Sequence, residues 1–403
     1  MENPVIIGAV RTPVGKAKKG NMANYRPDDF ASIVIKGLLE RVPDIPKEDI
    51  DDIILGCAMP EGEQGMNVAN IAKFNAGLSH KTSALTINRF CSSGLQALTL
   101  ANDSILAKRN DIVIAGGVES MSLVPMGGNK FSPNPALMDE YPEVYLNMGN
   151  TAERVAEKYN ITREEQDRFA YESNMKAVNA IKEDKFKEEV IPVEYEFTEV
   201  NSDQKRITKK IVVSKDEGPR ADTNTEVLGT LKTPFRLNGS VTAGNSSQMS
   251  DGAAVLLVVT EKKAKQYNIS PLARLVAYSV AGVPPEIMGI GPIEAIPKAL
   301  KQANLKLKDI GLVELNEAFA AQSLAIIKEL SLDPGIVNVN GGAISLGHPL
   351  GATGAILSVK LIHEMKRRNV RFGLISMCIG GGMGAAGIIE NLSYNKTFKQ
   401  KKK

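Results

Sequence analysis

The feature that most constrains the fold of this chain is an internal duplication. Two stretches repeat one order of elements, each passing from a helix through two strands to another helix, a further strand and a run of glycines. The matching segments are 30–39, 53–55, the residues up to 88, 91–109 and 111–117 in the first copy, and 293–303, 312–315, 337–340, 348–368 and 372–382 in the second. Alternating helical and strand periods predict mainly parallel sheets with helices outside. Two such units are expected to pack back to back, so that equivalent strand ends meet at one cleft.

The register of the two copies places Cys91 and His348 at equivalent points, each at the start of a helix. Three further matches keep their order: Asp49-Ile50 with Asp309-Ile310, Gly94 with Gly351, and Arg109-Asn110 with Arg368-Asn369. Chance similarity between two α/β segments is the alternative. The length over which the order is kept favours duplication.

The segment between the copies differs in character from both. It is rich in charge, proline and glycine, and its one clear helix at 163–182 begins with a capping box of Thr162 and Glu165. An insertion of this length favours a lid or binding subdomain, and an apolar strand at 253–260 returns the chain to the first sheet. The predicted organisation is an N-terminal half at 1–118 plus 248–270, a loop domain at 119–247, a C-terminal half at 271–392 and a basic tail at 393–403.

Composition narrows the class of protein. With 403 residues, 43% hydrophobic and 24% charged, the chain fits a soluble globular enzyme of two or three packed units. A net charge of +3 gives no electrostatic footprint for nucleic acid, and the lysines at 399 and 401–403 are interpreted as a solvated tail. We expect no membrane span and no signal peptide. The three cysteines, at 57, 91 and 378, lack disulfide-framework or metal spacing, which predicts a reducing cytoplasm and no metal site.

Cys91 is the first candidate for chemistry. It lies in the segment 88–97, where an expected strand turns into a helix. A helix N-terminus stabilises negative charge, so a thiol there is biased toward the nucleophilic thiolate, and its backbone N–H can face an oxyanion. The alternative is a buried cysteine that acts as a small hydrophobe. The small and polar neighbours argue against a purely apolar pocket.

His348 is the second candidate, in the glycine-rich segment 347–354. Pro349 suits the first helical position, and the glycines allow close backbone approach. The other two histidines, His80 in a polar loop and His363 on a helix face, are interpreted as structural. A lone histidine is more often structural than catalytic, but the matching position of Cys91 favours a catalytic pair.

Two further segments complete the candidate site. Cys378 lies in a glycine-rich loop at 377–384 that lacks the helix and Lys or Ser/Thr of a phosphate-binding loop. Free N–H groups beside a thiol instead suit an oxyanion site with an acid/base group. Asn316 follows the expected strand at 312–315, where it can hold a water, orient a histidine or simply cap a helix.

Together these segments resemble the thiolases. The resemblance rests on four motifs and covers about residues 4–391: Asn88-Arg89-Phe90-Cys91-Ser92-Ser93-Gly94, Asn316-Glu317-Ala318-Phe319, Gly347-His348-Pro349-Leu350-Gly351 and Cys378-Ile379-Gly380-Gly381-Gly382-Met383-Gly384. It implies a duplicated five-layer αβαβα fold with an inserted loop domain, usually in homodimers or homotetramers. It also implies a CoA-dependent acyltransferase that cleaves 3-ketoacyl-CoA in fatty acid β-oxidation.

The resemblance implies a role for each candidate. His348 takes the proton of Cys91, whose sulfur attacks the 3-keto carbon and keeps the acyl group. His348 and a water held by Asn316 stabilise the enolate of acetyl-CoA, and Cys378 acts as acid and base. The backbone N–H groups of Cys91 and Gly380 stabilise the tetrahedral oxyanion.

Coenzyme A is the implied co-substrate, with no tightly bound cofactor. Arg220 resembles the family residue that meets the nucleotide part of CoA, although a solvated surface charge is the alternative. The remaining implied substrate- or CoA-binding residues are Ala243 and Ser247 of the pantetheine segment, Ala318, Phe319 of the tunnel, and Met148.

Three departures from the family pattern bear on the substrate. Asn147 stands where short-chain members often have histidine, Gly218 replaces a larger residue, and Asn70 stands where arginine is frequent. These favour the degradative branch over biosynthetic acetoacetyl-CoA thiolases.

Rival interpretations are a ketosynthase-like condensing enzyme that uses a carrier protein and a non-catalytic CoA- or lipid-binding relative. Degradative members often work beside a hydratase/dehydrogenase, which makes such an enzyme a candidate partner.

Overall fold

The computed structural model describes residues 3–395, so the lysines of the expected basic tail lie outside the described residues. Within this range, one sheet of ten strands runs through both halves of the molecule in the order β10-β11-β12-β9-β1-β8-β5-β3-β4, with β2 paired to β8. Its strands are β1 (Pro4–Arg11), β2 (Gly15–Lys16), β3 (Asp52–Gly56), β4 (Ser83–Ile87), β5 (Ile112–Ser120), β8 (Ser250–Thr260), β9 (Ala273–Gly282), β10 (Leu312–Leu315), β11 (Phe372–Ile379) and β12 (Met383–Asn391). The two halves of this sheet meet where Ile6 of β1 pairs with Ala273 of β9.

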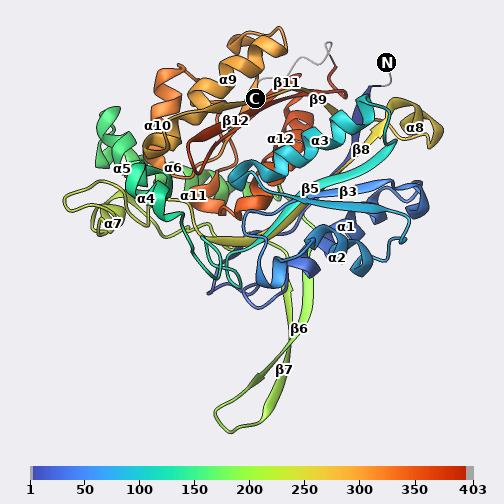
Figure 1. Cartoon of the computed structure of the whole chain (residues 1–403), viewed down its shortest axis with the longest axis horizontal. Helices are drawn as coiled ribbons and strands as arrows, with labels where there is room; N and C mark the ends of the chain where they lie inside the picture. The colour runs from blue at the N-terminus through green and yellow to red at the C-terminus, as the bar shows by residue number, and fades with distance from the viewer. Residues whose placement is uncertain (1–2, 396–403) are drawn as a thin grey trace.

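The helices form three layers around the two halves of the sheet, which gives the predicted five-layer order (Figure 1). α1 (Pro27–Arg41) and α2 (Val68–Asn75) cover the outer face of the first half, and α9 (Gly291–Gln302) and α10 (Ala320–Glu329) cover that of the second. α3 (Ser93–Leu106) and α12 (Leu350–Arg368) fill the space between the halves. Alternate residues of one strand serve different layers, as expected for a strand buried on both faces. In β5, Ile112 and Ile114 face α1, whereas Val113 and Ala115 face α3.

The sheet is mixed, so the expectation of mainly parallel sheets is wrong. β3 runs parallel to β4 and β5, and β10 runs parallel to β11. β8 is antiparallel to β1 and β5, and β12 is antiparallel to β9 and β11. The physical reason is the short turn at 380–382, because a turn of this length joins only antiparallel strands. In the first copy, the loop domain occupies the same connection, between β5 and β8.

The duplication is present in the topology. β1, β3, α3, β5 and β8 have their counterparts in β9, β10, α12, β11 and β12. The expected strand at 337–340 is reduced to one bridge between Val337 and Val313, at the place where β4 pairs with β3 in the first copy. The two copies therefore share one architecture, with the second copy shortened at its edge.

Two glycines let α3 and α12 cross at backbone distance. A Cβ on Gly354 would lie 2.4 Å from the backbone nitrogen of Leu95, and a Cβ on Gly94 would lie 2.6 Å from that of Ala355. These reciprocal contacts make Gly94 equivalent to Gly354, three residues beyond the predicted match with Gly351. The crossing fixes the separation of the two helices that follow the candidate catalytic residues.

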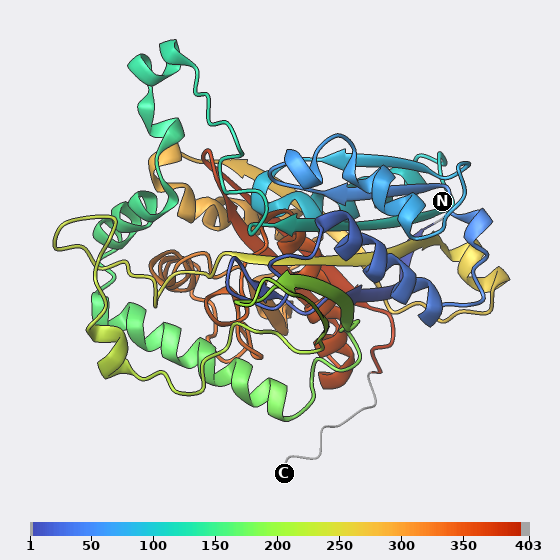
Figure 2. The same ribbon diagram turned by 90° about the horizontal axis from the view of Figure 1, so that it is seen from below.

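The loop domain contains the predicted helix and several unpredicted elements. α6 (Arg163–Lys182) has the expected capping box, because Thr162 Oγ1 accepts from the N–H of Glu165 and the Glu165 carboxylate accepts from the N–H of Thr162. The unpredicted elements are α4 (Pro135–Glu140), α5 (Met148–Lys158), β6 (Val193–Val200), β7 (Arg206–Val213) and α7 (Thr225–Gly229). The β6–β7 hairpin projects from the body of the molecule in Figure 1. The segment that carries α4 also extends from the body, as Figure 2 shows.

Short helices complete the described chain: α8 (Glu261–Gln266), α11 (Ala343–Leu346), and the 3₁₀ turns at 47–49, 62–64, 90–92, 142–145, 285–290 and 307–309. None of the helices within residues 3–395 combines the length and the apolar character needed to cross a membrane.

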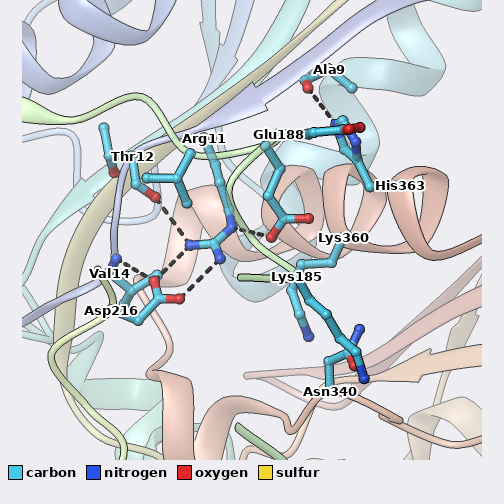
Figure 3. A network of polar contacts seen from close by, with 12 residues as sticks. Ala9, Arg11, Thr12, Val14, Lys185, Glu188, Asp216, Asn340, Lys360 and His363 are labelled. Carbon is cyan, nitrogen blue, oxygen red and sulfur yellow. Dashed lines mark hydrogen bonds and ion pairs between the residues drawn. The ribbon is translucent and has the colours of Figure 1, made fainter. Parts of the chain in front are cut away.

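A buried ion network ties the loop domain to the first half (Figure 3). Arg11, at the end of β1, donates two hydrogen bonds to the Asp216 carboxylate, at 2.6 and 2.9 Å, and one to Glu189 at 2.8 Å. The same Asp216 accepts from the backbone N–H of Val14 at 2.8 Å. Pairing and hydrogen bonding offset the cost of removing these charges from water. The network also fixes the start of the segment that leads to Arg220.

Candidate active site

Cys91 lies in a 3₁₀ turn at 90–92, just ahead of α3 rather than inside its first turn as predicted. Side-chain hydrogen bonds shape this turn. Ser93 Oγ accepts from the N–H of Arg89 at 2.8 Å and donates to the carbonyl of Phe90 at 2.7 Å. Phe90 has a φ of 43°, the left-handed region that few residues adopt. The strained turn presents the thiol between the two halves, where Cys91 packs against a cluster that includes Leu350 of the second half.

Burial decides the protonation state of Cys91. It raises the pKa of the thiol to about 11, and the charge of Glu119 adds to the rise, whereas the backbone N–H groups of Gly380 and of Cys91 itself oppose it. The expected bias toward thiolate is present in the two N–H groups, but burial outweighs it. At neutral pH the group is a thiol that needs a base before it can attack.

His348 lies at the opposite helix start and is 5% exposed. Its position is fixed through the main chain, because its N–H donates to the carbonyl of Gln248 and the hydroxyl oxygen of Ser250, both at 3.1 Å. Pro349 is the N-cap residue of α12, one position before the predicted one. Burial lowers the pKa of the imidazole to about 4, so the ring is neutral near pH 7 and can accept a proton.

Asn316 follows β10 and is fully buried beside the histidine. Its Nδ2 lies 3.3 Å from His348 Nε2, and its own N–H donates to the carbonyl of Ser376 at 2.9 Å. The cap of α10 is Phe319, so the helix-capping alternative for Asn316 is wrong. Among residues 3–395, its Oδ1 finds no hydrogen-bond partner.

Cys378 lies near the end of β11, and Gly380 begins the tight turn that leads to β12. Cys378 is 0% exposed and pairs with Gly384 across the hairpin. Burial first, and the neighbouring Cys91 second, raise the pKa of the Cys378 thiol. The N–H of Gly380 points at Cys91, and the turn continues through Gly381 and Gly382, whose φ values of 80° and 88° favour glycine. The hairpin thus brings a second thiol and a backbone donor to the first thiol.

Most of the predicted CoA-binding residues gather at the same place. Ala318, Phe319 and Cys378 share one apolar cluster, against which Met148 of α5 packs. The N–H of Ser247 donates to the carbonyl of Ala318 at 2.9 Å, which ties the pantetheine segment to this cluster. Two other candidates, Arg220 and Ala243, are exposed. The backbone N–H of Arg220 donates to Asn174 Oδ1 of α6 at 3.0 Å.

Sequence reasoning missed Glu119, the second-last residue of β5, which is 1% exposed. Its carboxylate accepts from the N–H groups of Ala58 and Gly351, both at 2.7 Å, and from Met59 at 3.2 Å. One carboxylate thereby joins the loop after β3 to the helix start that follows His348. The signal available in the sequence was a charged residue near the end of an otherwise apolar strand.

Sequence reasoning also missed Thr353, which lies in the first turn of α12 and contacts the ring of His348. Its hydroxyl oxygen lies 2.6 Å from His348 Nδ1. A hydroxyl residue one helical turn after a candidate base was the available signal.

This doubled fold, with two thiols, an imidazole and an amide at its centre, is that of an acyltransferase. The family model for the thiolase N-terminal domain matches residues 4–262, and the model for the thiolase C-terminal domain matches residues 269–391. The chain belongs to the thiolase family.

Similar proteins agree with this membership. The chain is 53% identical to a 3-ketoacyl-CoA thiolase of Bacillus subtilis (strain 168), over 97% of this chain and 100% of that protein. It is 45% identical to 3-ketoacyl-CoA thiolase 5, peroxisomal, of Arabidopsis thaliana, over 96% of this chain and 85% of that protein. A crystal structure of the Bacillus anthracis acetyl-CoA acetyltransferase superposes with a TM-score of 0.88 at 43% identity, and covers 97% of this chain and 99% of that one.

Proposed function

We propose that this chain is a 3-ketoacyl-CoA thiolase that cleaves its substrate with CoA into acetyl-CoA and a shortened acyl-CoA, and that Cys91 carries the acyl group. The observation that supports this most is the convergence on Cys91 of the Gly380 N–H and the Cys378 thiol. A binding protein has no use for two adjacent thiols, which argues against the non-catalytic alternative. The second thiol beside a glycine-rich turn also favours a thiolase over a condensing enzyme that uses a carrier protein.

The first half-reaction starts from neutral groups. His348 accepts the proton of Cys91 as the sulfur attacks the 3-keto carbon, which suits a raised thiol pKa and a lowered imidazole pKa. The backbone N–H groups of Cys91 and Gly380 stabilise the resulting oxyanion. The Cα–Cβ bond then breaks, and the electron pair passes to the enolate of acetyl-CoA. Cys378 protonates the enolate carbon, so acetyl-CoA leaves and the acyl group stays on Cys91 as a thioester.

The second half-reaction returns every group to its starting state. CoA loses its thiol proton to the thiolate of Cys378, and its sulfur attacks the acyl carbon on Cys91. The Cys91 sulfur leaves and takes its proton back from His348. Cleavage of one carbon–carbon bond is thereby divided into two acyl transfers through a covalent intermediate.

Asn316 and the loop domain have supporting roles in this proposal. Asn316 holds a water that, with His348, stabilises the enolate oxygen. Ala243, Ser247, Ala318, Phe319 and Met148 line the path of the pantetheine arm and the acyl chain, and Arg220 meets the nucleotide end. We propose 119–247 as the loop domain, and its support is the insertion of this segment between β5, which ends at Ser120, and β8, which begins at Ser250.

The acyl chain separates this proposal from its alternative. The relatives named 3-ketoacyl-CoA thiolase favour the degradative reaction, whereas the Bacillus anthracis neighbour is named for acetyl transfer. Thiolysis rates should be measured with 3-ketoacyl-CoA substrates from acetoacetyl-CoA to long chains. We expect turnover to extend beyond acetoacetyl-CoA, and strict limitation to acetoacetyl-CoA would assign the biosynthetic branch. The variant Cys91→Ala should be inactive with every substrate, and thiolysis by this variant at the wild-type rate would overturn the assignment.

We also propose that the enzyme is a homo-oligomer of the reducing cytoplasm. The edge strand β4 and the adjoining α2 expose large apolar side chains, including Phe74 at 52% and Leu85 at 43%. An unpaired, apolar sheet edge favours pairing with a second copy. The three cysteines are free, in keeping with a reducing compartment. A monomeric mass in sedimentation at micromolar concentration would refute the assembly.

A further inference from the structure

The ring of His348 is held at both nitrogens by side chains that are themselves buried. Nδ1 lies 2.6 Å from Thr353 Oγ1, and Nε2 lies 3.3 Å from Asn316 Nδ2. Thr353 is 3% exposed and Asn316 is 0% exposed. A neutral imidazole carries one proton on two nitrogens, so these contacts decide which nitrogen is the base.

The hydroxyl of Thr353 has another partner that accepts only. Its Oγ1 lies 2.9 Å from the carbonyl oxygen of Pro349, four residues earlier. Threonine in a helix commonly donates its hydroxyl proton to this carbonyl. With its one proton committed there, Oγ1 can only accept from His348. The ring proton then lies on Nδ1, and the lone pair lies on Nε2.

The contact on the other side of the ring agrees with this assignment. An amide nitrogen donates and cannot accept, so Asn316 Nδ2 beside Nε2 requires a lone pair on that atom. When Nε2 takes a proton from a thiol, Nδ1 keeps its own proton and its bond to Thr353. The hydroxyl of Thr353 needs no rotation between the two states.

We propose that Thr353 is a positioning residue that keeps the proton of His348 on Nδ1, so that Nε2 serves as the base for Cys91. The proposal rests on the proposed function for its kinetic consequence. Its structural statement, the tautomer of the resting ring, is independent of any reaction. The two can therefore fail separately.

The experiment compares two variants of Thr353 with a matched control. Thr353→Val keeps the shape and removes the hydroxyl, and Thr353→Ser restores it. The control is Thr99→Val, because Thr99 lies in the twin helix α3, is 8% exposed and donates to the carbonyl of Leu95 at 3.0 Å, without a histidine. The readouts are the ¹⁵N chemical shifts of the His348 ring and the kcat and KM of thiolysis.

We expect the wild-type ring to be protonated on Nδ1. In Thr353→Val the Nδ1–H is buried without an acceptor, so the proton should move to Nε2 and kcat should fall by about 10- to 100-fold with little change in KM. Thr353→Ser should recover the tautomer and most of kcat, and Thr99→Val should keep both. A wild-type ring protonated on Nε2, or a Thr353→Val enzyme with unchanged tautomer and kcat, would overturn the proposal. A wild-type chain that shows the Nδ1 tautomer but no thiolysis would instead refute the proposed function.

Discussion

Gly354→Ala tests whether the crossing of α3 and α12 fixes the active site. The added Cβ would lie 2.4 Å from the backbone nitrogen of Leu95, whereas ordinary contacts begin at 3.4 Å, so the helices must separate by about 1 Å. The neighbour is main chain and cannot rotate away. Overpacking of this kind costs about 1–3 kcal/mol of the free energy of unfolding.

The same shift should reach the chemistry, because Cys91 precedes one helix and His348 precedes the other. A misplacement of about 1 Å between reacting groups costs about 100-fold in rate. Urea unfolding would measure the free energy, and thiolysis would measure kcat.

The matched control is Gly229→Ala in α7, where an added Cβ meets nothing within 4 Å. This variant should keep the kcat and stability of the wild type. A Gly354→Ala enzyme with wild-type kcat and unfolding free energy would show that the two helices tolerate the added methyl group and that their crossing does not fix the site. A loss of stability without a loss of kcat would refute the link between the crossing and the site.

Three further predictions follow from the buried charges and thiols. Burial lowers the pKa of His348 to about 4 from the ordinary 6.5, so the unfolded chain binds a proton in this window that the native chain does not. The free energy of unfolding should therefore fall by about 3 kcal/mol as the pH falls from 6.5 to 4. Urea titrations of His348→Gln should lack this part of the pH dependence. A pH dependence identical to that of the wild type would disprove the prediction. Because the pKa of Cys91 is raised to about 11, inactivation by iodoacetamide should still accelerate up to about pH 10, and a plateau near the ordinary thiol pKa of about 8.5 would show that burial does not control this thiol. Asp216→Asn leaves Arg11 partly unpaired and should lower the unfolding free energy by about 3–5 kcal/mol. Asp222→Asn, at an exposed position, should change the unfolding free energy by less than about 0.5 kcal/mol. Equal effects of the two substitutions would mean that the buried ion network contributes nothing to stability.

Local patterns in the sequence predict much of this fold. The capping box of Thr162 and Glu165 marks the start of α6, and the apolar run after Pro4 marks β1, because both signals depend on near neighbours in the chain. Strand direction is not local. β8 and β12 read as ordinary buried strands, and only the connections around them make them antiparallel. The parallel prediction failed for that reason.

The candidate site was predicted through the motifs, but its electrostatics were not. The sequence predicts Cys91 at the start of a helix but does not reveal how far packing removes water from the thiol. Burial outweighs the favourable N–H groups and raises its pKa. Contacts across the two copies were equally hidden, including that of Glu119 with Gly351 and the three-residue offset of the crossing glycines. These depend on how the halves pack, which no single stretch of the chain encodes.

The acyl-enzyme on Cys91 is tested most directly by mass spectrometry of the enzyme quenched after it is mixed with a 3-ketoacyl-CoA in the absence of free CoA, where only the first half-reaction can proceed. We expect an acyl group on the peptide that contains Cys91, its removal when CoA is added, and its absence in Cys91→Ala. An acyl group on Cys378 instead, or release of acetyl-CoA without any acylated peptide, would rule out Cys91 as the carrier of the acyl group.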